Sequence, residues 1–130
     1  MEKQQKTIFL SVLGILILTV GVTAFFQSNQ APEGPGKYDS FAMCLQEKGA
    51  TFYGAFWCPH CQDQKKLFGK SAKLLPYVEC STPDGNGSTQ ICKDKNINGY
   101  PTWEFADESR LDGEVPLNTL SEKTGCVLPE

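Results

Sequence analysis

An apolar segment that runs directly into two closely spaced cysteines constrains the fold of this chain more than any other feature. Residues 50–57 are apolar at nearly every position, and Cys58-Pro59-His60-Cys61 follows without a break. Such a run predicts a central strand that is buried on both faces, and a proline is well tolerated at the first position of a helix. We therefore expect the strand to enter a helix through a turn that contains both cysteines.

Cys58 and Cys61 are spaced so that they can close a small disulfide at the start of this helix. At a helix start, free backbone N–H groups and the positive end of the helix dipole stabilise a thiolate. A stabilised thiolate attacks other disulfides through a mixed-disulfide intermediate. The first hypothesis is therefore thiol–disulfide exchange, with Cys58 as the nucleophile and Cys61 as the resolving thiol.

The N-terminal part of the chain carries a candidate membrane span. Residues 8–26 are uncharged and mostly apolar, close to the roughly 20 residues that a helix needs to cross a bilayer and beyond the roughly 7–15 of a signal-peptide core. Lys3 and Lys6 precede the run, so the positive-inside rule keeps residues 1–7 in the cytoplasm. We expect a single-pass signal-anchor in the cytoplasmic membrane, with the rest outside, in the periplasm or at the cell surface. A cleaved signal peptide is the alternative.

The remainder of the chain is long enough for one small domain. Residues 27–37 contain proline and glycine without an apolar pattern and are expected to form a linker, which leaves residues 38–130 for the domain. Apolar spacing and turn residues predict helices over 38–48, 59–69, 71–75, 89–96 and 116–124, and strands over 50–57, 77–80, 100–106 and 110–115. Strands separated by helices predict parallel crossovers, and the last two strands predict an antiparallel hairpin.

Charge and cysteine content exclude some functions and favour others. The net charge is −3 and the sequence has no basic cluster, which argues against nucleic acid as a partner. An even number of cysteines in an oxidising compartment predicts disulfides, and six follow the candidate span: Cys44, Cys58, Cys61, Cys80, Cys92 and Cys126. A four-cysteine zinc site is disfavoured because Cys80 and Cys92 are widely spaced. We expect no metal and no other cofactor, because sulfur alone carries the proposed chemistry.

Two separate motifs are similar to those of the thioredoxin superfamily. The first is the aromatic-Cys-x-x-Cys turn at residues 57–61, and the second is Gly-Tyr-Pro-Thr at residues 99–102. The resemblance implies a thioredoxin-like α/β fold, in which a central mixed sheet is flanked by helices. It also implies that Pro101 is cis and lies against the Cys58–Cys61 pair. An ordinary trans proline at the start of a strand is the alternative.

A narrower resemblance extends over most of the domain. Residues 41–42, 53–61, 77–80 and 100–103 are similar to the thioredoxin-like domain that is fused to bacterial vitamin K epoxide reductase homologues. Those proteins carry a multi-span membrane domain that makes disulfides with quinone. Because this chain has one candidate span, the resemblance implies that such a quinone-linked partner is a separate chain.

Residues beside the two motifs are candidates for tuning and for substrate binding. A cis proline has no N–H and makes a tight turn, which leaves the backbone of Tyr100 free to pair with an extended substrate. Trp57 and Tyr100 are expected at the surface, where they would receive unfolded peptide or a membrane partner. The dipeptide Pro59-His60 resembles that of periplasmic oxidants of the DsbA type. A hydrogen bond from His60 to the Cys58 thiolate would make the disulfide more oxidising, and an exposed histidine without influence is the alternative.

One position departs from the pattern of many thioredoxins. By spacing, Phe52 stands where those proteins carry a buried aspartate that accepts the proton of the resolving thiol. The departure argues against a thioredoxin-like reductase. Glu79, on the neighbouring predicted strand, is either a substitute carboxylate or a structural residue.

The four other cysteines are expected to form structural disulfides. The resemblance supports a Cys80–Cys92 bond across the loop at residues 81–88, worth roughly 3 kcal/mol by chain entropy. A second redox pair that relays electrons to Cys58–Cys61 is the alternative. Because the number of cysteines is even, the two that are left, Cys44 and Cys126, are expected to pair. This bond would tie the first helix to the C-terminus.

The sequence therefore predicts a membrane-anchored, extracytoplasmic thiol–disulfide oxidoreductase. Its expected substrates are thiol-containing exported proteins, in which it forms disulfides through the Cys58–Cys61 pair. The expected regenerating partner is a separate quinone-linked membrane oxidase of the vitamin K epoxide reductase type. Two alternatives are an anchored reductase supplied with electrons by a membrane transporter and a redox-inert thioredoxin-like binding module.

Overall fold

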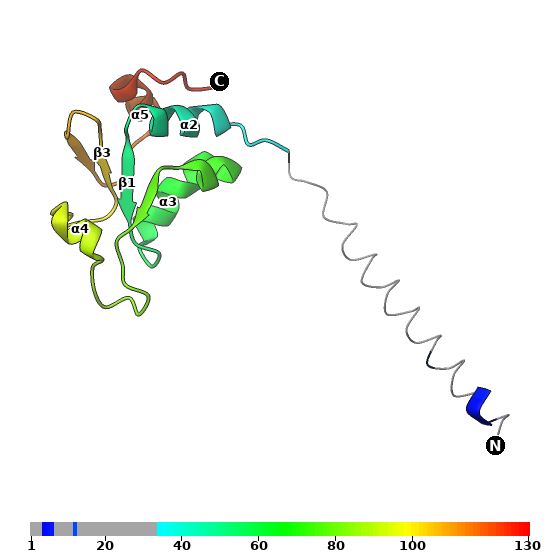
Figure 1. Cartoon of the computed structure of the whole chain (residues 1–130). Helices are drawn as coiled ribbons and strands as arrows, with labels where there is room; N and C mark the ends of the chain where they lie inside the picture. Colours follow the sequence, from blue (N-terminus) through cyan, green and yellow to red (C-terminus); the bar gives the residue numbers. More distant parts are fainter. Residues whose placement is uncertain (1–3, 7–11, 13–33) are drawn as a thin grey trace. The chain divides into compact units, whose positions relative to one another are not determined.

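The computed structural model describes residues 4–6, residue 12 and residues 34–130 (Figure 1). All of the predicted span at residues 8–26 except residue 12, and most of the predicted linker at 27–37, lie outside these residues. Within the described part of the chain, no helix has the length and apolar character needed to cross a bilayer. The compact unit Pro35–Glu130 is described below by itself.

The elements of this unit follow one another in the order that the sequence predicts. They are α2 (Asp39–Glu47), β1 (Thr51–Gly54), α3 (Pro59–Phe68), the 3-10 helix η1 (Gly69–Leu74), β2 (Tyr77–Glu79), α4 (Gln90–Asp94), β3 (Thr102–Glu104), β4 (Arg110–Asp112) and α5 (Leu117–Thr124). Most elements are shorter than predicted. The expected strand at residues 50–57 stops at Gly54, because the next residues turn away from the sheet and Cys58 N–H donates to the Ala55 carbonyl oxygen.

The four strands form one mixed sheet in the order β2-β1-β3-β4. Strands β1 and β2 are parallel, as predicted, and β3 and β4 form the predicted antiparallel hairpin. The prediction of a parallel crossover into β3 is wrong, because β3 runs antiparallel to β1. Helix α4 has only five residues and does not carry the chain back along the sheet. Strand β3 therefore starts at the end of the sheet where β2 stops.

Strand β1 is buried on both faces, and each face packs against different helices. Phe52 stacks on Trp103 with ring centroids 4.9 Å apart and belongs to a core that also contains residues of α2, α3 and α5. Tyr53 points to the other face, where it packs with Cys80 and with Cys92 of α4. In Figure 1, α3 and α4 accordingly lie on opposite sides of β1. This arrangement agrees with the predicted thioredoxin-like fold, a mixed sheet flanked by helices.

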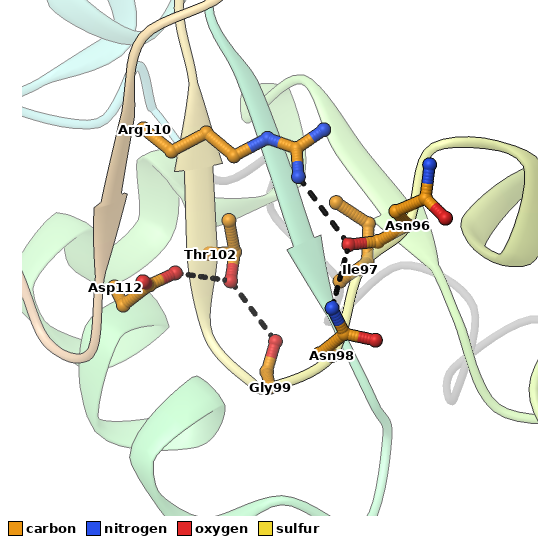
Figure 2. Close-up of a pocket in the computed structure, with 7 residues that line it drawn as sticks. All are labelled: Asn96, Ile97, Asn98, Gly99, Thr102, Arg110 and Asp112. Carbon is orange, nitrogen blue, oxygen red and sulfur yellow. Dashed lines mark hydrogen bonds between the residues drawn. The ribbon is translucent and has the colours of Figure 1, made fainter.

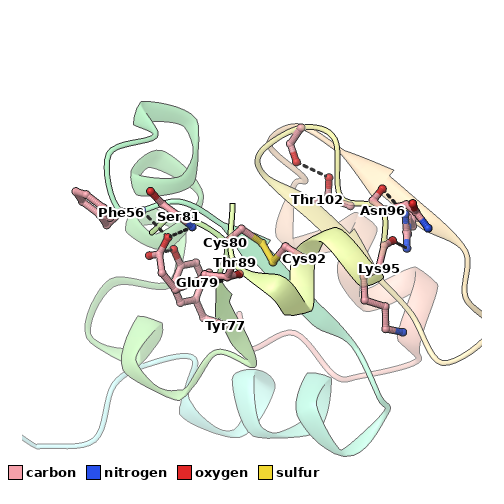
Figure 3. Close-up of a disulfide and its surroundings, with 12 residues drawn as sticks. Phe56, Tyr77, Glu79, Cys80, Ser81, Thr89, Cys92, Lys95, Asn96 and Thr102 are labelled. Atoms are coloured by element: carbon pink, nitrogen blue, oxygen red, sulfur yellow. Dashed lines mark hydrogen bonds between the residues drawn. A yellow bond between two sulfur atoms is a disulfide. The ribbon is translucent and has the colours of Figure 1, made fainter. Parts of the chain in front are cut away.

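Two disulfides brace the domain away from the Cys58–Cys61 pair. Cys44 of α2 is bonded to Cys126, beyond α5, across a sequence separation of 82. Cys80, at the end of β2, is bonded to Cys92 across a separation of 12 (Figure 3). The first bond closes most of the domain into one covalent loop, and the second attaches α4 to the sheet.

Removing the long-range disulfide should cost more stability than removing the short-range one. Chain entropy gives about 4.5 kcal/mol for the Cys44–Cys126 loop and about 3 kcal/mol for the Cys80–Cys92 loop. Urea unfolding of the full chain, followed by tryptophan fluorescence, to which the buried Trp103 contributes, would compare the two double alanine variants. An equal or reversed order of the two losses would contradict this expectation.

Candidate functional site

Cys58 and Cys61 lie at the start of α3, as the sequence predicts. Cys58 is the residue that caps the helix, and Pro59 takes its first position. The Cys61 backbone N–H donates a hydrogen bond to Cys58 Sγ across 3.3 Å. Both cysteines are free thiols in this structure. Cys58 is 4% exposed and Cys61 is fully buried, so Cys58 is the more accessible of the two residues.

The resolving thiol of Cys61, in α3, lies directly against β1. A Cβ atom added to Gly54 would lie 3.0 Å from Cys61 Sγ and 2.9 Å from Tyr77 Cε2, so this position leaves no room for a side chain. Burial, followed by hydrogen bonding with Cys58, raises the pKa of Cys61 to about 12. Cys61 therefore keeps its proton at neutral pH, and Cys58 is left as the nucleophile.

The loop before β3 brings the second motif against the nucleophile. The Tyr100–Pro101 peptide bond is cis, and Pro101 is fully buried. Cys58 Sγ lies 3.7 Å from the Tyr100 carbonyl oxygen, within reach of a weak S–H···O hydrogen bond. The two motifs that resemble thioredoxins thus form one site.

Aromatic side chains lie beside the nucleophile. Trp57 is 52% exposed, and its indole N–H donates to Ser81 Oγ across 2.8 Å. The rings of Trp57 and the partly buried Tyr100 meet edge to face with centroids 6.1 Å apart. Phe56 is also half exposed. These rings provide an apolar surface next to Cys58. The sequence predicts that a peptide or a membrane partner binds at this place.

Glu79 acts in this structure as a brace for the turn that precedes the cysteines. One carboxylate oxygen accepts hydrogen bonds from the backbone N–H groups of Phe56, at 3.2 Å, and of Ser81, at 2.8 Å. The other accepts from the Tyr77 hydroxyl at 2.8 Å (Figure 3). Glu79 therefore fits the structural alternative better than a substitute carboxylate. At the position of the thioredoxin aspartate, Phe52 is a core residue.

His60 does not take the position that the sequence predicts. Its side chain is 70% exposed, and Nδ1 lies 2.6 Å from Glu114 Oε1. In the part of the chain that the structure describes, His60 contacts Glu114, and the expected hydrogen bond from His60 to Cys58 is absent. Glu114 lies between β4 and α5, far from His60 in the sequence, so nothing in the local sequence indicates this contact.

A zinc site made of four cysteines is not compatible with the disulfide between Cys80 and Cys92. Cys80 and Cys92 are bonded to each other, so they do not offer free thiolates to a zinc ion shared with Cys58 and Cys61. A different group of candidate ligand atoms, on His60, Asp63 and Glu114, lies within 4.8 Å of one another. There, however, Lys66 already pairs with Asp63 at 2.6 Å.

A polar pocket of about 380 Å³ lies beside the cis-proline loop (Figure 2). Its lining residues are Asn96, Ile97, Asn98, Gly99, Thr102, Arg110 and Asp112. The Arg110 guanidinium donates to Glu104 and to the carbonyl oxygens of Lys95 and Asn96. The Thr102 hydroxyl lies 2.8 Å from Asp112 Oδ1. Because these polar groups satisfy one another, the pocket supports the loop, and we assign it no ligand.

Sequence reasoning missed three residues that shape the site, namely Gly54, Gln64 and Glu114. A glycine inside a strand is a recognised sign of close approach by another group, so Gly54 had a detectable signal. Gln64 is a fully buried polar residue of α3, and its partners come from another part of the chain. Neither it nor Glu114 carries a local pattern that indicates its role.

Replacing Gly54 by alanine should displace Cys61. The added methyl group would overlap Cys61 Sγ and the Tyr77 ring, and overpacking of this kind costs about 1–3 kcal/mol. The free energy of unfolding should therefore fall, and the rate at which the Cys58–Cys61 disulfide forms should fall with it. Gly34→Ala is the matched control, because a Cβ atom at Gly34 meets nothing within 4 Å and Gly34 lies outside the redox site. If the two variants had the same free energy of unfolding and the same rate of disulfide formation, the close contact at Gly54 would be contradicted.

The raised pKa of Cys61 should be visible in its alkylation. In a Cys58→Ser variant, iodoacetamide should label Cys61 slowly at neutral pH, and the rate should climb only at alkaline pH, because burial raises the pKa of this thiol. Mass spectrometry would measure the labelling, with Cys58 in a Cys61→Ser variant as the comparison. Rapid labelling of Cys61 at neutral pH would show that the thiol is not shielded.

Comparison with known proteins finds relatives with thiol–disulfide chemistry in their names, although no protein-family model matches the chain. The chain is 47% identical over 96 residues to thiol-disulfide oxidoreductase LTO1 of Arabidopsis thaliana, covering 70% of this chain and 25% of that protein. It is 26% identical over 122 residues to protein disulfide-isomerase A2 of Mus musculus, covering 72% of this chain and 23% of that protein. It is 24% identical over 117 residues to protein disulfide-isomerase MPD1 of Saccharomyces cerevisiae, covering 85% of this chain and 37% of that protein.

The chain spans between 23% and 37% of the length of these relatives. Their names support a thioredoxin-like redox function, with disulfide exchange as its chemistry. The mixed four-stranded sheet is flanked by helices, and the cysteine pair at the start of α3 lies against cis-Pro101. These features and the homologues together support a place for the chain in the thioredoxin-like superfamily.

Proposed function

We propose that the chain is an extracytoplasmic thiol–disulfide oxidoreductase that forms disulfides in exported proteins. The observation that carries the proposal is the position of Cys58. Its sulfur caps α3, accepts a hydrogen bond from the Cys61 N–H, and touches the cis-proline loop. A helix start favours the thiolate, which stabilises the reduced form and makes the disulfide a stronger oxidant.

The reaction begins from the Cys58–Cys61 disulfide. A substrate thiolate attacks Cys58 Sγ, the bond to Cys61 breaks, and Cys61 leaves with the electron pair and takes up a proton. A second substrate thiolate then attacks the substrate sulfur of the mixed disulfide and releases Cys58 as a thiolate. The substrate dithiol is oxidised to a disulfide, and the protein is reduced to the dithiol, which is the form seen here.

Two features of the site suit a protein substrate. The Cys58 sulfur lies beside the carbonyl of Tyr100, so an extended peptide that pairs with this loop would bring its own sulfur to Cys58. The half-exposed rings of Phe56 and Trp57 add an apolar surface on the same side of the domain. Unfolded exported proteins present both extended backbone and apolar side chains.

The membrane anchor and the electron acceptor are also part of the proposal. The apolar residues 8–26, preceded by Lys3 and Lys6, support a single span with the N-terminus in the cytoplasm. Reoxidation of the dithiol requires an acceptor. The resemblance of residues 53–61, 77–80 and 100–103 to a domain fused to vitamin K epoxide reductase homologues supports a separate, quinone-linked membrane oxidase.

An anchored reductase is the second candidate, and one observation favours it. His60 lies against Glu114 and not against Cys58, so the histidine that would strengthen an oxidant is engaged elsewhere. A less stabilised Cys58 thiolate would give a more reducing pair.

The reduction potential of the Cys58–Cys61 pair should separate these two functions. The full chain in detergent would be equilibrated with glutathione buffers, and the dithiol would be quantified by alkylation and mass spectrometry. We expect a value near the oxidant end of the superfamily, about −120 mV, whereas a value near about −270 mV would replace the proposed oxidant by the reductase.

Trapping should show whether the pair acts on proteins at all. A Cys61→Ser variant should accumulate mixed disulfides between Cys58 and exported proteins, because the resolving thiol is absent. A Cys58→Ser variant is the matched control and should accumulate none. Unchanged function in cells that carry Cys58→Ser would instead favour a redox-inert binding module.

A further inference from the structure

The segment between β4 and α5, residues 113–115, contacts both parts of the redox site. Its first residue, Gly113, donates its backbone N–H to the Pro101 carbonyl oxygen across 2.8 Å. The second, Glu114, lies 2.6 Å from His60 Nδ1. The third, Val115, is hydrogen-bonded through its backbone to the side chain of Gln64 of α3. Three consecutive residues thus connect the cis-proline loop to the helix that carries the cysteines.

Gln64 holds this segment in place. Its side-chain amide donates to the Val115 carbonyl oxygen at 3.0 Å and accepts from the Val115 N–H at 2.6 Å. Gln64 is fully buried, and a buried amide that loses such partners is costly. These bonds fix the position of Val115 against α3. Glu114, the preceding residue, therefore lies beside His60 in the first turn of the same helix.

Glu114 changes what His60 can do for Cys58. The ring nitrogen Nδ1 faces the carboxylate, so this nitrogen does not donate to a sulfur, and the contact holds the whole ring beside Glu114. The carboxylate also adds negative charge beside the start of α3, where the helix dipole otherwise favours a thiolate. The other charges nearby are Asp63 and Lys66, which pair with each other at 2.6 Å. The pKa of Lys66 is raised by Asp63 and also by Glu114, so Lys66 offsets part of the Glu114 charge.

We propose that Glu114 is a positioning residue that holds His60 away from Cys58 and so limits the oxidising strength of the Cys58–Cys61 pair. The inference deepens the proposed function, because it needs Cys58–Cys61 to be a redox pair. It does not depend on whether the pair serves as an oxidant or as a reductase. In both cases the Glu114–His60 contact sets the potential lower than His60 alone would set it.

A Glu114→Gln variant of the full chain tests this proposal. Equilibration with glutathione should show the dithiol favoured by about threefold relative to the unchanged protein, the size expected for an exposed charged contact. Glu122→Gln is the matched control, because it removes the same charge from the exposed side of α5. Thermal unfolding of each variant would show that the fold is kept.

A His60→Ala variant separates positioning from simple charge. Alone, it should change the equilibrium by less than about twofold, since His60 is engaged by Glu114 and exposed pairs of this kind contribute little. Combined with Glu114→Gln, it should remove at least half of the shift that Glu114→Gln causes, because the freed histidine is then missing.

Three results would overturn the inference. They are an unchanged equilibrium in Glu114→Gln, a shift toward the disulfide, or a shift of which more than half persists when His60 is absent. Each can arise whatever the absolute potential of the unchanged protein, so the inference and the proposed oxidant role fail separately. If Glu114→Gln does not fold, a large effect of His60→Ala alone would still contradict the proposal.

Discussion

The close contact between α3 and β1 at Gly54 is the constraint on which the rest of the site depends. Because Gly54 has no side chain, Cys61 Sγ and the Tyr77 ring can lie directly on the strand. This contact buries the resolving thiol and raises its pKa to about 12. Cys58 is then left at the helix start, with the Cys61 N–H directed at its sulfur.

The surroundings hold this arrangement from several sides. Glu79 braces the turn before the cysteines, and residues 113–115 tie α3 to the cis-proline loop. The Cys44–Cys126 and Cys80–Cys92 bonds close the frame outside the redox pair. Such a frame can stay covalently closed while Cys58 and Cys61 change between dithiol and disulfide, which is what repeated disulfide exchange requires.

Local patterns predicted much of the fold, and their failures have physical causes. The order of the elements and the helix that starts at Pro59 follow from apolar spacing, proline and turn residues. Strand β1 stops earlier than its apolar run because Phe56 and Trp57 leave the sheet and become half exposed. The direction of β3 was predicted wrongly because nothing in the sequence showed that α4 is too short to return the chain along the sheet.

The sequence by itself determined which chemical groups the site contains: two cysteines at a helix start, a histidine between them and a proline in a second motif. Their immediate neighbours in the chain decide these features, so a local pattern can reveal them. Only the tertiary structure decided what surrounds those groups. His60 meets Glu114 across a separation of 54 residues, and Gln64 meets Val115 across 51. Such contacts depend on how the elements pack together, and packing is a property of the whole domain that no single stretch of sequence encodes.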